Sequence, residues 1–574
     1  MAKKKYSLAN ITALYQEVVS ERSEFEAEWR SISDYLLPGR GIYQQYSKPR
    51  KRKLTSPRVI NTVAEDALYV LTSGMHGALT SPSRMWFKNE WADDNINEHE
   101  PLKAWIQDCT KREHAGFHAS NFYSVMNSFY IELVGFGTAC LYMGEDSDTV
   151  QAPFRFELLT AGEYAFSTGS DGLLATFFRT IFMTPRQLVQ RFPKTASKEA
   201  KNLVKKNEPG ADTSYITVIE YVTREPYEDK PITRIFYETT SGGARGNFGY
   251  LPSGPEPLEE SGFYEFPYLV ARWNTIGSDI YGIGPGSRSL PDIKRLQEME
   301  KAFLMATHKS INPPLNAPAR MRGKLNTLPG GYNYYANPQE TVNEIYQVRF
   351  DYSGVGNAVE RVEQRIQRNF FNDIFLTASR DPNSSPLKAT QVNVQEQEKM
   401  LRLGPVIERL QHEFLQPLIQ RGFNIMLRKE LFQLLSPELA DLVGDFVTRL
   451  ISPLATAQRA VALQGIQSFM GFIGQAAQFD QNILDNIDAD EAAREFADIT
   501  GIELGVLRPR EEVQALREQK AKAMAQQKAK EDAQQDAMLQ SQMSGEQATA
   551  SKDQSVAGLN MLEGQQLSQD MGML

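Results

Sequence analysis

The sequence is poor in cysteine and has no recognisable secretion signal. Only two cysteines, Cys109 and Cys140, occur in 574 residues, so neither a disulfide framework nor a paired CxxC zinc site can be built. This cysteine usage predicts a reducing compartment. The basic N-terminus is not followed by an apolar h-region, so we predict no secretory signal.

The motifs of common nucleotide-binding and hydrolytic enzymes are also missing. The Gly323-Lys324 pair is followed by Leu325 rather than by Ser or Thr, which excludes a P-loop. The glycine-rich stretch 282–286 contains Pro285, which has no amide hydrogen for a phosphate, so we interpret it as a tight turn before a helix. No GxSxG nucleophile elbow occurs, and the S-x-x-K match at 385–388 lacks its partner motifs.

Histidine is scarce, and only one pair has a spacing that could hold zinc. His114 and His118 are separated by four residues, but Ala115 stands where a metalloprotease requires Glu. We therefore favour packing or surface roles for both histidines. An enzyme is the minority interpretation, and we predict no catalytic residues, no metal site and no cofactor.

Positive charge is in short supply overall, with 62 Lys and Arg against 71 Asp and Glu and a net charge of −9. A protein that wraps nucleic acid tightly is normally basic, so any DNA contact here should be local or loose. Two basic patches stand out, and each could be a solvated or inter-subunit ion-pair surface or a contact for an acidic partner or nucleic acid. The first comprises Lys48, Arg50, Lys51, Arg52 and Lys53, and the second Arg320, Arg322 and Lys324.

Long hydrophobic runs are absent apart from one uncharged stretch at 460–479. Glutamines interrupt this stretch at mostly helical spacing, which is typical of a helix with a polar stripe packed in protein. We therefore predict no membrane role.

Apolar residues recur at helical spacing towards both ends of the chain, and runs of residues typical of strands lie between them. Apolar spacing predicts helices over about 14–32, 64–79 and 100–143. Thr184, Pro185 and Gln187 predict a capped helix start. Short aromatic and β-branched runs predict strands at 154–158, 176–182, 216–222, 232–237 and 268–273.

The C-terminal half contains two amphipathic helices of similar length, predicted at 287–310 and 355–377, with Ser289 as a plausible N-cap of the first. A small non-helical insertion separates them. A long helix should then run over 386–430, with kinks at Gly404-Pro405 and Pro417. The fold class is mixed α+β and mainly helical, with more helices to about residue 507 and a Gln-rich, partly disordered tail over 511–574.

Three ordered stretches resemble the head-to-tail connector, or portal, proteins of short-tailed double-stranded DNA phages. The stretch from Asn61-Thr-Val-Ala-Glu-Asp-Ala-Leu to Ser81-Pro-Ser-Arg-Met-Trp-Phe is similar to the family's N-terminal helix and the turn after it. Met183-Thr-Pro-Arg-Gln-Leu resembles the start of its wing helix, and Tyr281-Gly-Ile-Gly-Pro-Gly-Ser-Arg-Ser-Leu-Pro-Asp the entry into its first stem helix.

The resemblance implies a portal fold with wing, stem, clip and helical crown, assembled as a ring around a DNA channel. Portal rings usually contain twelve subunits. The implied parts are a wing over 1–286, stem helices over 287–310 and 355–377, a clip over 311–354, a tunnel loop over 378–386, a long kinked wing helix over 386–430, a crown over 431–510 and the tail over 511–574.

The resemblance also implies partners and contact residues. The expected partners are further copies of the chain, the DNA in the channel, the terminase large subunit, the major capsid and scaffolding proteins, tail adaptor proteins and internal core proteins at the crown. Lys48 to Lys53 would face a neighbouring subunit or the capsid, and Arg320, Arg322 and Lys324 would serve docking at the clip. The tunnel loop would meet DNA through Arg380, Asn383, Ser384, Ser385 and Lys388.

A virion location, at a capsid vertex after assembly in the host cytoplasm, follows from the same resemblance. Two alternatives remain: another virion structural protein, such as a tail adaptor or minor capsid protein, and an unrecognised hydrolase or nuclease. The chain's length and its helix–insertion–helix–loop–long-helix order favour a portal over a shorter adaptor.

Overall fold

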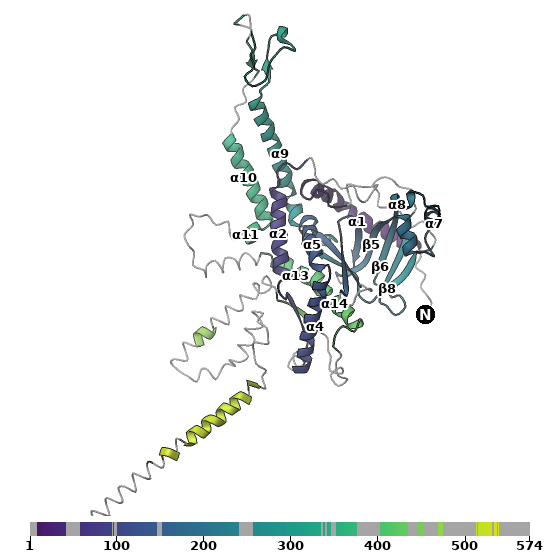
Figure 1. The fold of residues 1–574 in the computed structure, drawn as a ribbon, viewed down its shortest axis with the longest axis vertical. Coiled ribbons are helices and arrows are strands. Elements are labelled where there is room, and N and C mark those ends of the chain that lie inside the picture. Colours follow the sequence, from purple (N-terminus) through teal and green to yellow (C-terminus); the bar gives the residue numbers. More distant parts are fainter. Residues whose placement is uncertain are drawn as a thin grey trace, which may run out of the picture. The chain divides into compact units, whose positions relative to one another are not determined.

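A computed structural model describes most of the first 451 residues and short stretches beyond them. The described residues are 8–41, 58–93, 96, 100–145, 152–170, 172–239, 256–334, 337–338, 341–345, 352–375, 402–433, 446–451, 469–473, 512–513, 515–530, 533–535 and 538. The chain divides into two compact units, Met1–Ala462 and Leu463–Leu574. The fold of the first unit is the mixed α+β, mainly helical class that the sequence predicts (Figure 1).

Four helices form much of the core of the first unit: α1 (Leu8–Tyr35), α2 (Val63–Leu79), α4 (Glu100–Ala119) and α5 (Phe122–Phe136). Helix α5 is almost entirely buried over its last eight residues. It ends because Gly137 adopts a left-handed conformation with φ 80°, which favours glycine. The chain then enters strand β2 (Thr138–Glu145), so the prediction of helix through residue 143 is wrong.

The strands form two antiparallel sheets in the middle of the sequence. One has three strands in the order β3-β2-β9, and the other five in the order β4-β5-β6-β7-β8. Five of these strands cover the runs predicted from the sequence. The bounds are β3 Phe154–Leu159, β4 Tyr164–Thr168, β5 Leu174–Met183, β6 Ile216–Thr223, β7 Ile232–Glu238, β8 Glu259–Phe263 and β9 Tyr268–Arg272.

Helices cover both faces of the five-stranded sheet. The first half of α1 packs Tyr15 and Val18 against Ile219 and Tyr221 on one face. Helices α6 (Pro185–Arg191), α7 (Lys198–Lys205) and α8 (Gly210–Thr213) follow β5, and an apolar cluster joins α6 and α7 to the strands. The predicted capping box of α6 is confirmed, since Thr184 and Gln187 bond reciprocally.

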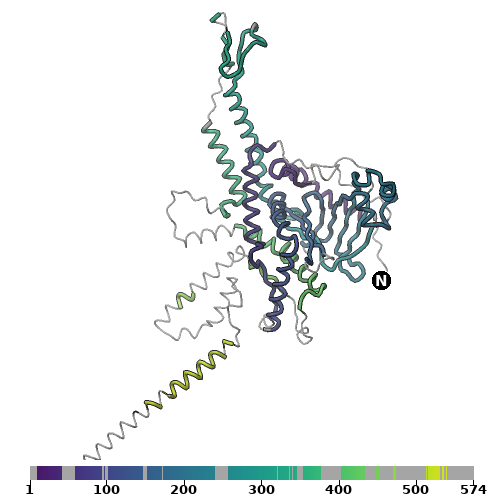
Figure 2. Tube along the Cα trace, viewed as in Figure 1, coloured from purple at the N-terminus to yellow at the C-terminus, as the bar shows by residue number. Residues whose placement is uncertain are grey.

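Two antiparallel helices project from this body, α9 (Pro285–Ile311) and α10 (Tyr352–Asn369), as Figures 1 and 2 show. Helix α9 begins four residues before Ser289, because Pro285 occupies its first turn, so the predicted N-cap at Ser289 is wrong. The second predicted helix does not run unbroken to 377. It stops at Asn369, Phe371 takes a left-handed φ of 55°, and a separate turn, α11, covers Asn372–Phe375.

The chain between 402 and 428 is helical, but its irregularities differ from those predicted. Gly404 and Pro405 start helix α13 (Gly404–Leu410) instead of kinking it. A π-helical turn, η3 (Gln411–Leu415), then leads into α14 (Gln416–Arg428). Pro417 has no amide hydrogen to donate to residue 413, and a widened turn accommodates this loss.

Strand β1 (Phe87–Trp91) pairs antiparallel with β12 (Phe446–Leu450), which lies about 360 residues later in the chain. Residues 446–450 are therefore strand, and the expectation of helix throughout 431–510 is wrong there. In the second unit, residues 469–473 and 515–530 are largely helical. No helix in the described part of the chain is long and apolar enough to cross a membrane.

Candidate functional site: the helical arm and its tip

The arm, α9 and α10, is buried at its base and uncovered further out. Ile293 and Ile366 are fully buried in the main core, next to α2 and α5. Along the outer half of α9 the apolar side chains are uncovered, with Leu304 50%, Met305 49% and Ile311 77% exposed. The base is thus part of the body, whereas the outer arm carries an apolar surface that the single chain does not cover.

Polar contacts fix the base of the arm to the start of α2. Asn61 Nδ2 donates to Glu300 Oε1 of α9 at 3.0 Å and to Glu363 Oε1 of α10 at 2.8 Å. The side chain of Gln297, itself buried, accepts from the amide of Asn61 at 2.9 Å and donates to its carbonyl at 2.8 Å. One short segment before α2 therefore holds both arm helices.

The glycine-rich turn 282–286 lets the entry to α9 lie directly against the end of α5. A Cβ on Gly286 would lie 2.3 Å from the carbonyl oxygen of Gly135, and a Cβ on Gly284 would lie 2.7 Å from that of Val134. Both contacts are with backbone atoms, which cannot turn aside. The interpretation of 282–286 as a structural turn before a helix is confirmed.

The tip is the connection between α9 and α10, and its described residues are 312–334, 337–338 and 341–345. It has two short paired strands, β10 (Leu315–Asn316) and β11 (Asn343–Glu344), and a 3-10 turn, η2 (Ala319–Met321). Asn333 accepts from the amide of Asn326 at 2.7 Å and donates to its carbonyl at 2.8 Å.

This clasp closes the loop around Pro329-Gly330-Gly331 and presents apolar side chains to solvent. Leu328 is 73% exposed, Tyr332 80% and Tyr334 87%. Because the loop satisfies backbone groups internally, these side chains are held outward by a preorganised turn. Aromatic side chains displayed in this way are typical of docking surfaces.

The structure describes only one of the three predicted contact groups. Arg322 and Lys324 lie exposed at the tip, on either side of Gly323, which has a left-handed φ of 77°. Arg320 lies in η2. The basic patch at Lys48, Arg50, Lys51, Arg52 and Lys53 lies outside the described residues, as do Arg380, Asn383, Ser384, Ser385 and Lys388 of the predicted tunnel loop.

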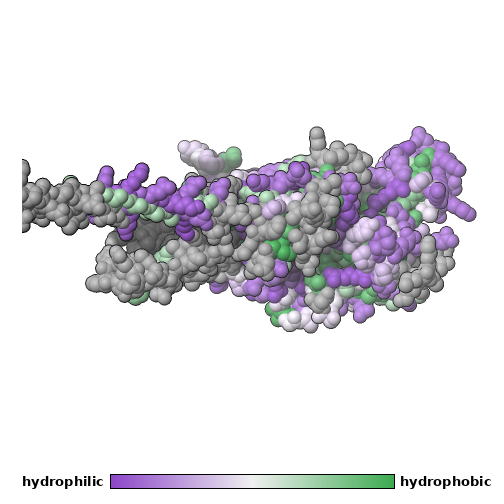
Figure 3. Space-filling view, turned by 90° about the horizontal axis from the view of Figure 1, so that it is seen from below, coloured by the Kyte–Doolittle hydropathy of each residue, from purple (hydrophilic) through white to green (hydrophobic). Residues whose placement is uncertain are grey.

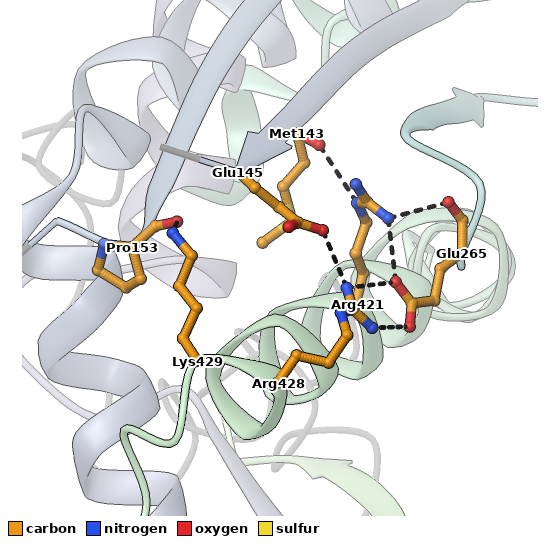
Figure 4. A network of polar contacts seen from close by, with 7 residues as sticks. All are labelled: Met143, Glu145, Pro153, Glu265, Arg421, Arg428 and Lys429. Atoms are coloured by element: carbon orange, nitrogen blue, oxygen red, sulfur yellow. Dashed lines mark hydrogen bonds and ion pairs between the residues drawn. The ribbon is translucent and has the colours of Figure 1, made fainter. Parts of the chain in front are cut away.

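The segment that follows the predicted loop is anchored by a charge network around the buried Arg421, which the sequence did not reveal (Figure 4). Arg421 of α14 is 1% exposed and donates to Met143 O of β2 and to the carbonyl and carboxylate of Glu265. Arg428 donates to the same carboxylate at 2.5 Å and to Glu145 at 3.0 Å. Burial lowers the pKa of Arg421.

The network pins α14 to β2 and to the turn between β8 and β9. A second contact holds η3, where Glu413 accepts from Arg272 Nη2 at 2.7 Å and from its backbone amide at 3.1 Å. Both carboxylates come from segments more than 100 residues away from their arginines, so no local sequence signal marks the pairs.

Metal-ligating side chains do not gather into a site in the described part of the chain. No group of three His, Cys, Asp or Glu side chains there is arranged to hold a metal ion. The rings of His114 and His118 lie 5.0 Å apart, and His114 packs against Trp86 and Phe87. Burial lowers the pKa of His114 to about 4, and His118 contributes.

Comparison with known proteins agrees with the resemblance read from the sequence. The family model described as "Bacteriophage head to tail connecting protein" matches residues 8–507. The chain is 33% identical over 511 residues to the "Probable portal protein" of Bordetella phage BPP-1, covering 88% of this chain and 89% of the relative. It is 31% identical over 522 residues to the "Portal protein" of Salmonella phage epsilon15, covering 88% and 90%.

Among solved structures, the neck of an empty GTA particle matches with a TM-score of 0.36 and 8% identity, over 71% of this chain and 86% of that one. The family assignment depends on the sequence comparisons, which span nearly the whole of the first unit and continue into the second. The predicted resemblance is confirmed, and this chain belongs to the bacteriophage head-to-tail connecting, or portal, family.

Proposed function

We propose that copies of this chain form a closed ring at one capsid vertex, through which genomic DNA is packaged and later ejected. Membership of the family makes the protein a structural component of the virion at the junction of head and tail. Both curated relatives are named portal proteins, so the alternatives of a tail adaptor, minor capsid protein or hydrolase are not favoured. The ring, its usual number of twelve subunits and the passage of DNA are parts of the proposal.

The main observation in support of ring assembly is the uncovered apolar surface of the arm and tip. Among the described residues, seven of the exposed large apolar side chains lie between 304 and 345. A soluble monomer rarely displays so much apolar surface on one projection. Packing each arm against its neighbours around a closed ring would bury it.

The proposal assigns the parts of the chain as the sequence predicts them. The arm helices would be the stem that surrounds the channel, and the tip would be the clip, where Arg322 and Lys324 flank a glycine turn and the two tyrosines are displayed. The terminase large subunit and, later, tail adaptor proteins would dock there. Major capsid, scaffolding and core proteins would contact the other parts.

The predicted tunnel-loop residues Arg380, Asn383, Ser384, Ser385 and Lys388 remain proposed DNA contacts. A channel must pass every sequence without gripping it, so sparse positive groups and a net charge of −9 suit the task. Lys48, Arg50, Lys51, Arg52 and Lys53 remain proposed contacts to a neighbouring subunit or the capsid.

The ring is tested by placing a charge on the uncovered face of the arm. Leu304→Glu together with Met305→Glu should shift the protein from rings to monomers in native mass spectrometry at micromolar concentration. Ile276→Glu is the matched control, because Ile276 is 60% exposed but lies outside the arm. A wild-type protein that stays monomeric, or an arm variant that assembles as well as the control, would contradict the proposal.

A further inference from the structure

A short helix on the five-stranded sheet carries a concentration of positive charge that the sequence analysis did not single out. Between Arg191 and Asn207 the sequence has six positive residues and one negative residue, in a chain whose net charge is −9. Lys198, Lys201 and Lys205 follow the spacing i, i+3, i+7, which places them on one side of α7. We call these three residues and Lys194, in the loop before α7, the lysine face.

The lysine face is built on a rigid support. Helix α7 begins at Ser197, whose hydroxyl accepts from the amide of Ala200 and whose own amide donates to Glu238 of β7 at 3.1 Å. Ala200 is fully buried beneath the helix, on the side away from the lysines. The Nζ of Lys201 donates to the carbonyl of Lys194 at 2.8 Å, which ties the loop to the helix.

Nearby carboxylates leave most of this charge unneutralised. The described chain offers no carboxylate within ion-pair distance of Lys194, Lys198 or Lys205. Glu199 is the one acid within α7, whereas Asp212 pairs with Arg186 and Glu208 lies 3.8 Å from Lys206. The end of the first unit that carries α7 and α8 is predominantly hydrophilic in the space-filling view (Figure 3).

The chemistry of this face suits a polyanion better than a protein interface. Residues 185–213, which form α6, α7, α8 and their loops, expose no large apolar side chain, so the lysine face has no anchor of the kind that protein hot spots need. Lysines are compact point charges that can approach any phosphate without reading sequence. Lys198 and Lys205 are separated by about 10.5 Å along the helix, a reach that spans neighbouring phosphates of a duplex.

We propose that the lysine face binds the backbone of double-stranded DNA without sequence preference, as a surface separate from any channel. The separation follows from the packing: the apolar cluster beneath α7 comprises residues of α6, α7, β5, β6, β7 and their loops, and none from α9 or α10. Binding at the lysine face therefore does not require ring formation. The face would contact the phosphate backbone of DNA that lies outside the channel.

The experiment uses the full-length protein and relaxed, covalently closed plasmid DNA, which cannot enter a closed ring. Binding is measured by gel shift and sedimentation between 50 and 200 mM salt. In the variant Lys198→Gln/Lys201→Gln/Lys205→Gln, the slope of log affinity against log salt should flatten by about 2.7, since each lost phosphate contact contributes about 0.9. Over that fourfold salt range the wild-type affinity should then fall about 40-fold more than that of the variant.

The matched control is Lys520→Gln/Lys522→Gln/Lys528→Gln, which removes the same charge from an exposed helical stretch of the second unit. It should keep the wild-type salt slope. Oligoglutamate serves as the probe for an acidic protein partner, and circular dichroism checks the fold of both variants.

Equal slopes for the two variants would overturn the proposal. So would loss of oligoglutamate binding by the lysine-face variant while its binding to plasmid stays at the wild-type level. A ring that assembles normally but fails to bind closed DNA would refute this site and leave the proposed function intact. A monomer that binds closed DNA through the lysine face would support the site and count against the ring.

Discussion

Replacing Glu113 by Gln is expected to stabilise the protein by an amount that grows as the pH rises. Glu113 of α4 is completely buried. One carboxylate oxygen accepts a hydrogen bond from Asn89 Nδ2 at 3.0 Å, and the other has no hydrogen-bond partner. Burial raises the pKa of Glu113 well above 4.5, and the Asn89 hydrogen bond offsets this only in part.

No nearby charge compensates for this carboxyl group. His114 follows it in α4, and burial lowers the pKa of His114 to about 4, so the ring is neutral above pH 5. Cys109 lies one turn earlier, and burial raises the pKa of its thiol to about 12. Burial therefore favours the protonated form of Glu113 in the folded state, and in that form the side chain resembles a glutamine.

The magnitude follows from linkage. Between the pKa of about 4.5 in the unfolded chain and the higher pKa in the folded protein, only the folded state holds the proton. Each pH unit in this window then costs the wild type about 1.4 kcal/mol of unfolding free energy. The stability of Glu113→Gln relative to wild type should therefore rise with pH from about 4.5 until the pH reaches the folded-state pKa of Glu113.

Urea denaturation followed by tryptophan fluorescence measures this difference. Trp86 immediately precedes strand β1 and Trp91 is its last residue. Because β1 also contains Asn89, the fluorescence of these tryptophans reports on the structure around Glu113. Glu90→Gln is the control, because it makes the same chemical change on the outward side of β1, where Glu90 pairs with Lys88 and Arg449. Parallel pH profiles for wild type and Glu113→Gln would refute the reasoning, since they would mean that Glu113 is charged in the folded protein.

Two further substitutions probe the base of the arm. Gly286→Ala should cost about 3 kcal/mol or more in thermal unfolding, because its Cβ would lie 2.3 Å from the carbonyl oxygen of Gly135. Asn61→Asp should cost roughly 2–4 kcal/mol at pH 7 and much less at pH 4, because it replaces the donor to Glu300 and Glu363 with a third carboxylate that acid neutralises.

Each of these changes has an internal control. Gly356→Ala lies in the outer part of α10 with nothing within 4 Å of the new Cβ, so it should be neutral or stabilising by about 0.5–1 kcal/mol. Aspartate at 61 keeps the acceptor for the amide of Val63, so the loss reports the missing donor and the added negative charge. A tolerant Gly286→Ala, or a pH-independent Asn61→Asp, would contradict the described packing of the arm base.

Local patterns predicted the elements whose signal lies within a few residues. The apolar spacing of α9 and α10, the capping box at Thr184 and five strand runs all depend on neighbours in sequence. The predictions are wrong where the conformation of a segment depends on contacts with residues far away in the sequence. Phe371 carries no breaker signal, yet it takes a left-handed conformation where α10 gives way to α11. Strand β2 follows an apolar helix after one glycine, and its pairing with β3 and β9 makes it a strand.

In the candidate site, too, local features could be predicted from the sequence and long-range contacts could not. Basic residues and turns at the tip are visible in the sequence, because charge and glycine content are local. The ion pair of Arg421 and Glu265 could not be predicted, because the two residues are 156 positions apart and neither has an unusual neighbourhood in the chain. The lysines of the lysine face can be read from the sequence, but the orientation of α7 cannot. Only the structure shows that α7 buries Ala200 and that its three lysines lie on the opposite side of the helix.

The spacing of apolar residues in α9 also does not predict which of these side chains are exposed to solvent. An apolar stripe predicts that a helix packs against something, and α9 has one along its whole length. Within the described chain, the stripe meets α5 and α10 near the base, whereas Leu304, Met305 and Ile311 meet solvent. The apolar surface of the outer arm is therefore in excess of what the monomer needs, and an interface between copies is the simplest physical reason for a sequence to keep it.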